Sequence, residues 1–559
     1  MVLGMACVAV GSVADALYLP HQSLWHDEAV QMSGLSLNPA EVTGWLAGKV
    51  HHDFGVGEDR MPPLSYWAGW AWSELFGLGE RSMRWFGVTC VAAATGILFA
   101  SARSAWGLAA GSAAALLLAT SPNVIVQAVE IRAYPLLILE SAGLFACLIG
   151  YSSGSKEARR RWLIGILACG LAAMYTHFFG LVALGGALVA AFAVARARGE
   201  SVWPVITLAC VAAVAAVGLW PFVVASAHLS ESGAGPTEGK VVGLVRMGYR
   251  LFSHPAMSLS PVAVGLVLVG WAVGLGSALV PRKDSAEGAM GLALALASGT
   301  AVVALAQLAQ RSFEAARPSY NVWMLPALAL LMASGLAARA RTLRAASFLG
   351  IMLALIANLY AAGQLAVRGD AFAHTPHRHI AGLIHRYGPG KVALIHDGDT
   401  AGAWGIFSPV RYEFGTSPPQ FGYLPDASEP QRVRLTTYPP SEARLELSDL
   451  RFDVLIVIRP EQRNAKDIAE QLRRGIVPLG DGPVVRALLA SGRWERVEEE
   501  TYLAFVGADV DVFRSTRPGG PAAGHSGYGL DDPGSGKRGL AFLLPEHFGT
   551  VCTRLRPGL

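Results

Sequence analysis

The feature that most constrains this chain is a series of long apolar segments that starts at its first residues and stops near residue 365. A helix needs about 20 apolar residues to cross the ~30 Å hydrocarbon core of a bilayer. Of the 559 residues, 53% are hydrophobic and 15% are charged, whereas soluble domains carry about 25% charged residues. We therefore expect a polytopic α-helical membrane protein of the cell membrane, followed by a water-soluble part.

Eleven segments are predicted to cross the membrane, within a transmembrane domain that covers residues 1–365. The first lacks a basic beginning and a small-residue cleavage site, so we expect a retained helix rather than a signal peptide. The predicted spans are residues 1–20, 84–102, 106–124, 133–151, 162–178, 180–195, 202–221, 260–280, 289–310, 321–338 and 345–365.

Basic residues recur in every second loop between these spans, and cytoplasmic loops carry an excess of Lys and Arg. The loops predicted to face the cytoplasm contain Arg103, Lys156–Arg161, Arg196 and Arg198, Arg282 and Lys283, and Arg339–Arg344. The opposite, extracytoplasmic side then receives the loops around residues 21–83, 125–132, 176–179, 222–259 and 311–320, together with everything after 366.

One further apolar stretch, Pro62–Gly77, tests this assignment. Its sixteen residues would reach only about 24 Å as a helix, and counting it as a span would export every basic loop. We therefore predict an interfacial helix rich in Tyr and Trp. A second interfacial helix is predicted from Asn38, because an N-cap residue, Pro39 and the acidic Glu41 follow one another as they do at helix starts.

After residue 365 the chain becomes polar, with short apolar strands at Lys391–His396 and Asp453–Ile458. Helical patterns at 376–387 and 461–474 alternate with them, which predicts a small extracytoplasmic α/β domain over 366–515 with a partly parallel sheet. Residues 516–559 are rich in Gly, Pro and Ser, so a disordered tail is expected there.

Several classes of partner and framework are disfavoured by composition. Five of the six cysteines lie in or near apolar segments, and no disulfide framework or metal-ligand cluster is visible. The net charge of +4 is small for this length and the basic residues sit in short loops, so nucleic acid is not an expected partner.

Two adjacent carboxylates follow the first span directly, in the segment Ser23–Ala29 that also contains His26. Acidic residues this close to hydrocarbon indicate a functional role. Alternatively, Asp27 or Glu28 caps the next short helix. Spacing alone leaves both interpretations open.

This segment and the aromatic stretch from Pro62 to Tyr66 resemble the first outer loop of the GT-C superfamily, which includes oligosaccharyltransferases, protein O-mannosyltransferases and aminoarabinose transferases. Glu130–Tyr134 (EIRAY) resembles the second acidic motif of that superfamily, and Tyr175–Gly180 and Arg317–Tyr320 are similar to later landmarks on the same side. The resemblance covers roughly residues 20–340.

The resemblance implies a membrane glycosyltransferase that uses a polyprenyl-phosphate sugar donor, with Asp27 as the catalytic acidic residue and inversion at the anomeric carbon. The second loop departs from the family because it lacks an Asp-x-Asp motif. No metal ligand is therefore assigned, and a divalent metal requirement stays open.

Sugar transfer from a lipid phosphate requires a base for the acceptor hydroxyl, and a carboxylate can serve. Asp27 is the first candidate and Glu28 the second. The departing phosphate needs cations, for which Arg132 and Arg317 are candidates because guanidinium binds phosphate oxygens in a bidentate manner. For each arginine the alternative is an ordinary structural ion pair, for instance that of Arg132 with Glu130.

The remaining predicted substrate-binding residues are Glu130, Tyr134, His177 and Tyr320. For His177 the alternative is a histidine packed at a helix end. Two other polar groups carry weaker hypotheses: a metal site that combines Asp27 with a nearby loop, and an acceptor-binding turn after the first soluble strand. The first contains His51, His52, Asp53 and Glu58, and the second contains His396, Asp397 and Asp399.

The predicted function is transfer of a hexose or pentose from a polyprenyl-phosphate donor to an extracytoplasmic lipid, glycan or protein. A secondary transporter is the main alternative, although it should show repeated halves and ionisable residues at mid-membrane. A cell-envelope ligase or acyltransferase of another family is a further alternative, which would depend on an outer-loop histidine rather than on Asp27.

Overall fold

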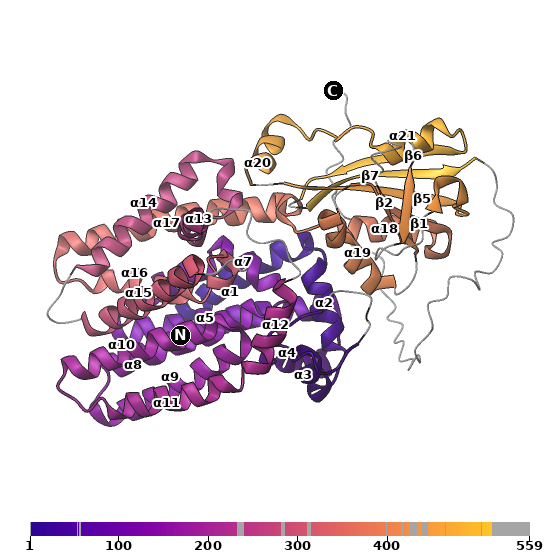
Figure 1. Cartoon of the computed structure of the whole chain (residues 1–559). Helices are drawn as coiled ribbons and strands as arrows, with labels where there is room; N and C mark the ends of the chain where they lie inside the picture. Colours follow the sequence, from indigo (N-terminus) through magenta and orange to yellow (C-terminus); the bar gives the residue numbers. More distant parts are fainter. Residues whose placement is uncertain are drawn as a thin grey trace. The chain divides into compact units, whose positions relative to one another are not determined.

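The structure is a computed structural model in which residues 1–517 form one compact unit (Figure 1). It describes residues 2–52, 54, 58–231, 240–280, 286–309, 315–398, 400–414, 418–424, 433–437, 445–463, 465–504 and 506–516. The predicted disordered tail therefore lies outside the described residues apart from Thr516. The predicted boundary at residue 366 falls inside the compact unit and stays a prediction.

Seven described helices are long and apolar enough to cross a membrane, and up to nine spans result if two bent helix pairs are counted. The seven are α1 (Val2–Tyr18), α5 (Glu80–Trp106), α8 (Tyr134–Ser153), α10 (Phe179–Ala197), α14 (Pro261–Leu279), α15 (Ala286–Ala309) and α17 (Arg341–Arg368). The predicted polytopic helical fold is confirmed.

In both bent pairs a proline lies in the first turn of the second helix. Helix α6 (Leu108–Ala119) meets α7 (Pro122–Val129) at 58°, and α11 (Trp203–Val217) meets α12 (Trp220–Glu231) at 50°. Pro122 begins α7 and Pro221 is the second residue of α12, and a ring without an N–H is tolerated at such positions. Ser121, which precedes Pro122, has extended backbone angles of φ −61° and ψ 119°, as expected for a residue before proline. Two predicted spans are therefore broken helices.

The other two predicted spans also form helices, α9 (Lys156–Thr176) and α16 (Met324–Ser334). Helix α9 begins inside the basic run. Helix α16 has 11 residues, all of them buried, so it covers only about 17 Å. Each of the eleven predicted ranges thus corresponds to a helix or a bent pair, while seven to nine meet the length and composition required of a span.

Two of the predicted cytoplasmic loops lie side by side at one end of the bundle. Arg159, at the start of α9, pairs with Glu200 after α10, and Arg198 donates to the carbonyl oxygen of Ser152 at the end of α8. Figure 1 shows these connections at the end opposite α2 (His26–Leu35) and α3 (Pro39–Leu46). The basic loop at 282–283 lies outside the described residues, and the sidedness itself stays a prediction.

Short helices gather at the other end of the bundle: α2, α3, α4 (Leu64–Phe76) and α13 (Lys240–Phe252). The capping box predicted at Asn38 is confirmed, since its side-chain oxygen accepts from the backbone N–H groups of Ala40 and Glu41 at 3.0 Å. Helix α4 has 13 residues, or about 20 Å, which is too short for a span. Helix α13 was not predicted.

The C-terminal part is built on a seven-stranded sheet with strand order β4-β3-β2-β1-β5-β7-β6. Strand β1 is buried and parallel to β2 and β5, whereas the other pairs are antiparallel. The strands are β1 (Val392–His396), β2 (Gln420–Leu424), β3 (Arg434–Thr437), β4 (Leu445–Glu446), β5 (Val454–Gln462), β6 (Trp494–Tyr502) and β7 (Val506–Ser515).

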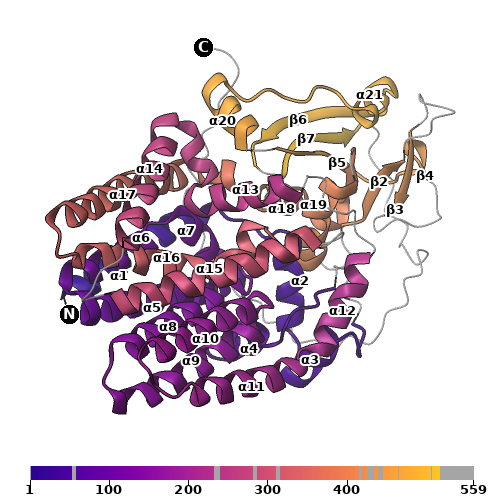
Figure 2. The same cartoon turned by 60° about the vertical axis from the view of Figure 1, so that its left-hand side comes forward.

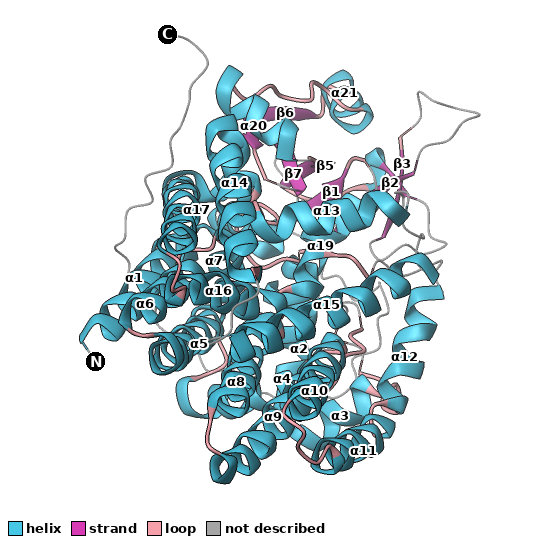
Figure 3. Cartoon of the chain, turned by 90° about the vertical axis from the view of Figure 1, so that its left-hand side faces the viewer, coloured by secondary structure: helices cyan, strands magenta, loops and turns pink. Residues whose placement is uncertain are grey.

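Helices cover both faces of this sheet. The apolar side chains of α18 (His377–Tyr387) and α19 (Thr400–Phe414) pack on one face and those of α21 (Pro483–Ala490) on the other. Helix α20 (Ala465–Arg474) follows β5. Figure 3 shows that the labelled strands all lie in this part of the chain. The predicted α/β fold with a partly parallel sheet is confirmed.

Candidate functional site

The first predicted motif forms the start of α2. Trp25 is the N-cap, with extended backbone angles of φ −128° and ψ 176°, and its side chain makes no capping hydrogen bond. Asp27 and Glu28 lie in the first turn, where the positive end of the helix dipole favours carboxylates. The alternative in which Asp27 or Glu28 is the helix cap is therefore wrong, because the cap position belongs to Trp25.

Glu28 is completely buried, and both of its carboxylate oxygens accept hydrogen bonds. Its two carboxylate oxygens accept from Arg84 on α5 at 2.9 and 3.0 Å, and one of them also accepts from the backbone N–H of Ile131 at 2.8 Å. Arg84, equally buried, donates to the carbonyl oxygen of Val129 at 2.6 Å. This pair joins α2, α5 and the second outer loop. The catalytic role predicted for Glu28 stays a prediction, and its contacts suit a positioning role better.

Asp27, by contrast, keeps 31% of its side chain exposed. A guanidinium nitrogen of Arg132 lies 3.8 Å from its carboxylate, and Arg132 also donates to the Asp27 carbonyl oxygen at 3.2 Å. The same arginine pairs at 3.1 Å with Asp59, which accepts from the hydroxyl of Tyr66 at 2.7 Å. Arg132 thus pairs with Asp59 and Asp27 rather than with Glu130. The alternative of an ordinary structural ion pair therefore stays open for Arg132, with other partners than the example given for it.

Four basic side chains act on the Asp27 carboxylate. Burial raises its pKa, but the positive charges of Arg132, His26, Arg317 and His374 lower it, and the pKa falls below the ordinary value of 3.8. Asp27 is therefore ionised at neutral pH. It is both accessible and in the form that accepts a proton.

A cluster of aromatic rings brings together three further predicted residues. The ring of His177, between α9 and α10, lies 5.7 Å from that of Tyr134 and 5.4 Å from that of Tyr320. His177 is 3% exposed, and its Nδ1 accepts from the backbone N–H of Phe179 at 3.2 Å. His177 thus contacts Tyr134 and Tyr320, two of the other predicted substrate-binding residues. It is also packed at a helix end, as the alternative proposes, so both interpretations stay open.

Arg317 lies beside this aromatic cluster. Its guanidinium carbon is 5.4 Å from the centre of the Tyr320 ring and one nitrogen is 3.4 Å from the Tyr320 hydroxyl. It is exposed and forms no ion pair with any carboxylate in the part of the chain that the structure describes. The structure therefore brings Asp27, Arg132 and Arg317 to one polar site.

Glu130 is 4% exposed and accepts from Nε2 of His374 at 2.8 Å. His374 and Asp59 were not predicted. His374 lies in a histidine-containing run after the last span, and Asp59 precedes Pro62 in a polar loop. Their only sequence signal is their residue type, which many other loop residues share.

The two weaker hypotheses fare differently. Of the proposed metal ligands, Asp53 lies outside the described residues, while His51 pairs with Glu58 at 3.0 Å. Among the described residues no three His, Cys, Asp or Glu side chains lie where they could hold a metal ion. At the end of β1, His396 and the following Asp397 are buried, and the His396 ring lies 2.9 Å from the Gln420 side chain. Asp399 is outside the described residues, and the acceptor-binding role stays a prediction.

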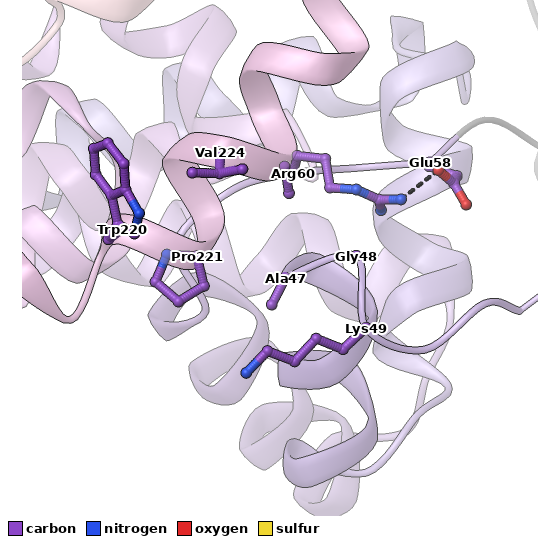
Figure 4. A pocket seen from close by; sticks show the side chains of 9 residues that line it. Ala47, Gly48, Lys49, Glu58, Arg60, Trp220, Pro221 and Val224 are labelled. Atoms are coloured by element: carbon purple, nitrogen blue, oxygen red, sulfur yellow. Dashed lines mark hydrogen bonds and ion pairs between the residues drawn. The ribbon is translucent and has the colours of Figure 1, made fainter.

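A cavity of about 480 Å³ lies next to the site, between the end of α3 and the start of α12 (Figure 4). Figure 2 shows where these two helices lie in the fold. Glu58 and Arg60 contribute to its wall and pair with each other, whereas the residue between them, Asp59, binds Arg132 instead. Its lining residues are Ala47, Gly48, Lys49, Glu58, Arg60, Trp220, Pro221, Val224 and Ala225.

These features define a multi-pass membrane protein with a buried ion-pair network and a carboxylate surrounded by basic groups at one end of its helices. Residues 60–221 match the family model described as dolichyl-phosphate-mannose-protein mannosyltransferase. The match includes Arg132, Tyr134 and His177 and begins after Asp27 and Asp59. It confirms the predicted resemblance to the GT-C superfamily, and it indicates glycosyltransferase activity.

Two solved proteins illustrate the structural likeness. ArnT from Cupriavidus metallidurans bound to undecaprenyl phosphate is 15% identical, with 91% of this chain and 97% of that chain covered at a TM-score of 0.48. The Archaeoglobus fulgidus oligosaccharyltransferase in complex with zinc and sulfate is 14% identical, with 64% and 53% covered at a TM-score of 0.38. No match was found among curated protein sequences.

Proposed function

We propose that this protein transfers a sugar from a polyprenyl-phosphate donor to a hydroxyl of an extracytoplasmic lipid, glycan or protein, with Asp27 as the general base. One observation carries the proposal. Asp27 is ionised, partly exposed and surrounded by Arg132, Arg317, His26 and His374, beside a segment that matches a mannosyltransferase family.

The chemistry needs one bond to form and one to break. The acceptor oxygen attacks the anomeric carbon, Asp27 takes the proton of the acceptor hydroxyl, and the bond between the anomeric carbon and the phosphate oxygen breaks. The electron pair leaves with the lipid phosphate, which is already a stable anion. A single displacement of this kind inverts the anomeric centre. A general base must approach the hydroxyl to within ~2.6 to 3.2 Å, which the accessible carboxylate of Asp27 permits.

Arg317 is the stronger of the two candidates for the donor phosphate. Arg132 already binds the carboxylates of Asp59 and Asp27, whereas Arg317 contacts the aromatic Tyr320. A guanidinium not paired with a carboxylate can offer two parallel N–H groups to phosphate oxygens. We assign Arg317 to the phosphate first and Arg132 to a supporting contact that also orients Asp27.

Donor binding then also activates the base. The four basic groups hold the pKa of Asp27 down, which makes a free Asp27 a weak base. A phosphate anion at Arg317 offsets part of that positive charge, because opposite charges in a partly buried site cancel over several ångströms. The pKa of Asp27 rises toward its ordinary range once the donor is in place, so the base gains strength when it is needed.

The aromatic cluster completes the proposed donor site. Tyr134, His177 and Tyr320 each pair an apolar ring with a polar tip, which suits the mixed surface of a sugar attached to a phosphate. Glu130 is assigned to the same site, one residue before the backbone N–H that binds Glu28. The alternation of basic loops supports an extracytoplasmic position for the site and for residues 366–515.

The test uses the purified full-length protein with a panel of radiolabelled polyprenyl-phosphate sugars, with and without crude membrane acceptors. Transfer to an acceptor, or slow release of free sugar without one, is expected for at least one donor. Asp27→Asn should lower that rate by ~10² to 10⁴, the range for a lost base. A folded wild-type protein that neither transfers nor hydrolyses any donor would overturn the proposed function, and near-normal transfer by Asp27→Asn would overturn the assignment of the base.

A further inference from the structure

The segment between α17 and α18 folds back on the loop that leads into α2. Thr375 donates from its hydroxyl to the carbonyl oxygen of Leu24 at 3.1 Å, and the backbone N–H of Arg378 donates to the Ser23 hydroxyl at 3.3 Å. Earlier in the segment, the Tyr18 hydroxyl donates to the carbonyl oxygen of Phe372 at 3.3 Å. Residues some 350 positions apart in the chain are thereby held together at the entrance to the Asp27 helix.

The start of α2 lacks a side-chain cap. Asp, Asn, Ser or Thr usually hold the first turn of a helix by accepting a backbone N–H, but the N-cap of α2 is Trp25, which cannot. The Trp25 ring stacks instead on His374, with ring centres 4.1 Å apart and an interplanar angle of 16°. The first turn of α2 is thus positioned from outside the helix.

The other edge of the same imidazole reaches the second outer loop. Nε2 of His374 donates to Glu130 at 2.8 Å, and Glu130 directly precedes Ile131, whose N–H binds Glu28. A buried carboxylate such as Glu130 requires a hydrogen-bonding partner, because an unpaired buried charge is costly. His374 therefore joins the residue two positions before Asp27 to the residue two positions before Arg132.

We propose that His374 is a positioning residue for Asp27: by stacking on Trp25 and donating to Glu130, it fixes the Asp27 carboxylate relative to Arg132 and the donor. The segment between α17 and α18, which contains His374, is then part of the catalytic centre. This inference rests on the proposed function, since it assigns a partner to the proposed base.

Three substitutions separate the two contacts of His374. Phe keeps a ring on Trp25 but cannot donate to Glu130, Gln keeps a donor but loses the stacked ring, and Ala loses both. His374→Ala should lower kcat roughly 10- to 100-fold, the range for losing a hydrogen bond to a charged group, while donor KM changes by less than about 3-fold. Phe and Gln should each restore part of kcat. The control is His385→Phe, which breaks an exposed histidine contact with Glu413 and should leave kcat unchanged.

A double substitution decides whether His374 acts through Asp27. If it does, Asp27→Asn with His374→Ala should be no slower than Asp27→Asn alone, because residues that act as a unit are not additive. A loss equal to the product of the two single losses would overturn the inference, as would wild-type kcat in His374→Ala. If His374→Ala does not fold, equal kcat values in wild type, His374→Phe and His374→Gln would also overturn the inference. The inference alone fails when Asp27→Asn is inactive and His374→Ala is normal, whereas normal transfer by Asp27→Asn removes the proposed base and the inference together.

Discussion

Replacing Glu28 by Gln removes one charge from the most deeply buried ion pair described at the site. Both Glu28 oxygens bind Arg84, and one of them also holds the Ile131 N–H. Gln keeps a single acceptor oxygen and directs an NH₂ group at the Arg84 guanidinium, which is itself only a donor. The substitution therefore leaves a buried cation with one carboxylate, Glu80, at 2.9 Å.

The expected cost follows from the burial of both partners. Glu28 and Arg84 are each 0% exposed, so solvent does not screen the loss, and removing one member of a buried pair costs about 3 to 5 kcal/mol of folding free energy. The matched control is Glu470→Gln, which breaks a surface pair with Arg474 on one helix turn and should cost about 0.3 to 0.5 kcal/mol.

The assay follows the reaction of buried thiols with a maleimide dye in detergent while the temperature rises. Cys7 and Cys90 are buried, and Cys90 lies on α5 with Arg84, so their reactivity reports opening of this region. Glu28→Gln should expose them at a clearly lower temperature than wild type, and Glu470→Gln should not. Identical curves for the two variants would refute the reasoning. A Glu28→Gln protein that keeps wild-type stability but loses transfer ~10²-fold or more would place Glu28 in the chemistry.

Three further outcomes are expected. Arg317→Lys keeps the charge but loses the bidentate fork, so donor KM should rise about 10-fold, and unchanged kinetics in both Arg317→Lys and Arg317→Ala would show that this arginine is structural. The pKa of Asp27 is held below its ordinary value in the folded protein. Its ion pairing therefore contributes stability that is complete above the unfolded pKa and is lost as pH falls through the folded one. The loss of stability between pH 5 and about 2, followed by tryptophan fluorescence, should be smaller in Asp27→Asn than in wild type. Alkaline phosphatase fused after residue 515 should be active, and activity of only a cytoplasmic reporter there would reverse the predicted topology.

The sequence predicted those features that depend on neighbouring residues. Apolar runs predicted the helices, and Asn38 and Glu41 predicted a capping box. The apolar run at 391–396 predicted a strand, which the structure places at the centre of the sheet. Local patterns did not predict the bends at Pro122 and Pro221 because the apolar run continues through each break. Helix α13 has an amphipathic pattern of apolar and basic residues in its sequence, but it was missed because the whole stretch 222–259 was assigned to an outer loop.

The site was predicted only in part, because its partners are far apart in the chain. Asp27, Arg132 and Arg317 were found through resemblance to a family, and the structure brings them to one end of the bundle. The contact between Glu130 and His374 joins residues 244 positions apart, and the one between Arg132 and Asp59 joins residues 73 positions apart. No periodicity or spacing connects such pairs, and a single histidine or aspartate in a polar loop carries no sign of its partner.

Helix α16 has a consequence for how the protein is made. Its 11 residues are all buried against protein, with α5, α6, α8, α14, α15 and α17 as neighbours, and about 17 Å of helix cannot satisfy a ~30 Å bilayer by itself. Five of these six helices precede it in the chain, so they can already be inserted when α16 leaves the ribosome. Insertion of α16 is then a protein-packing step in which helices made earlier, rather than lipid, receive the new segment.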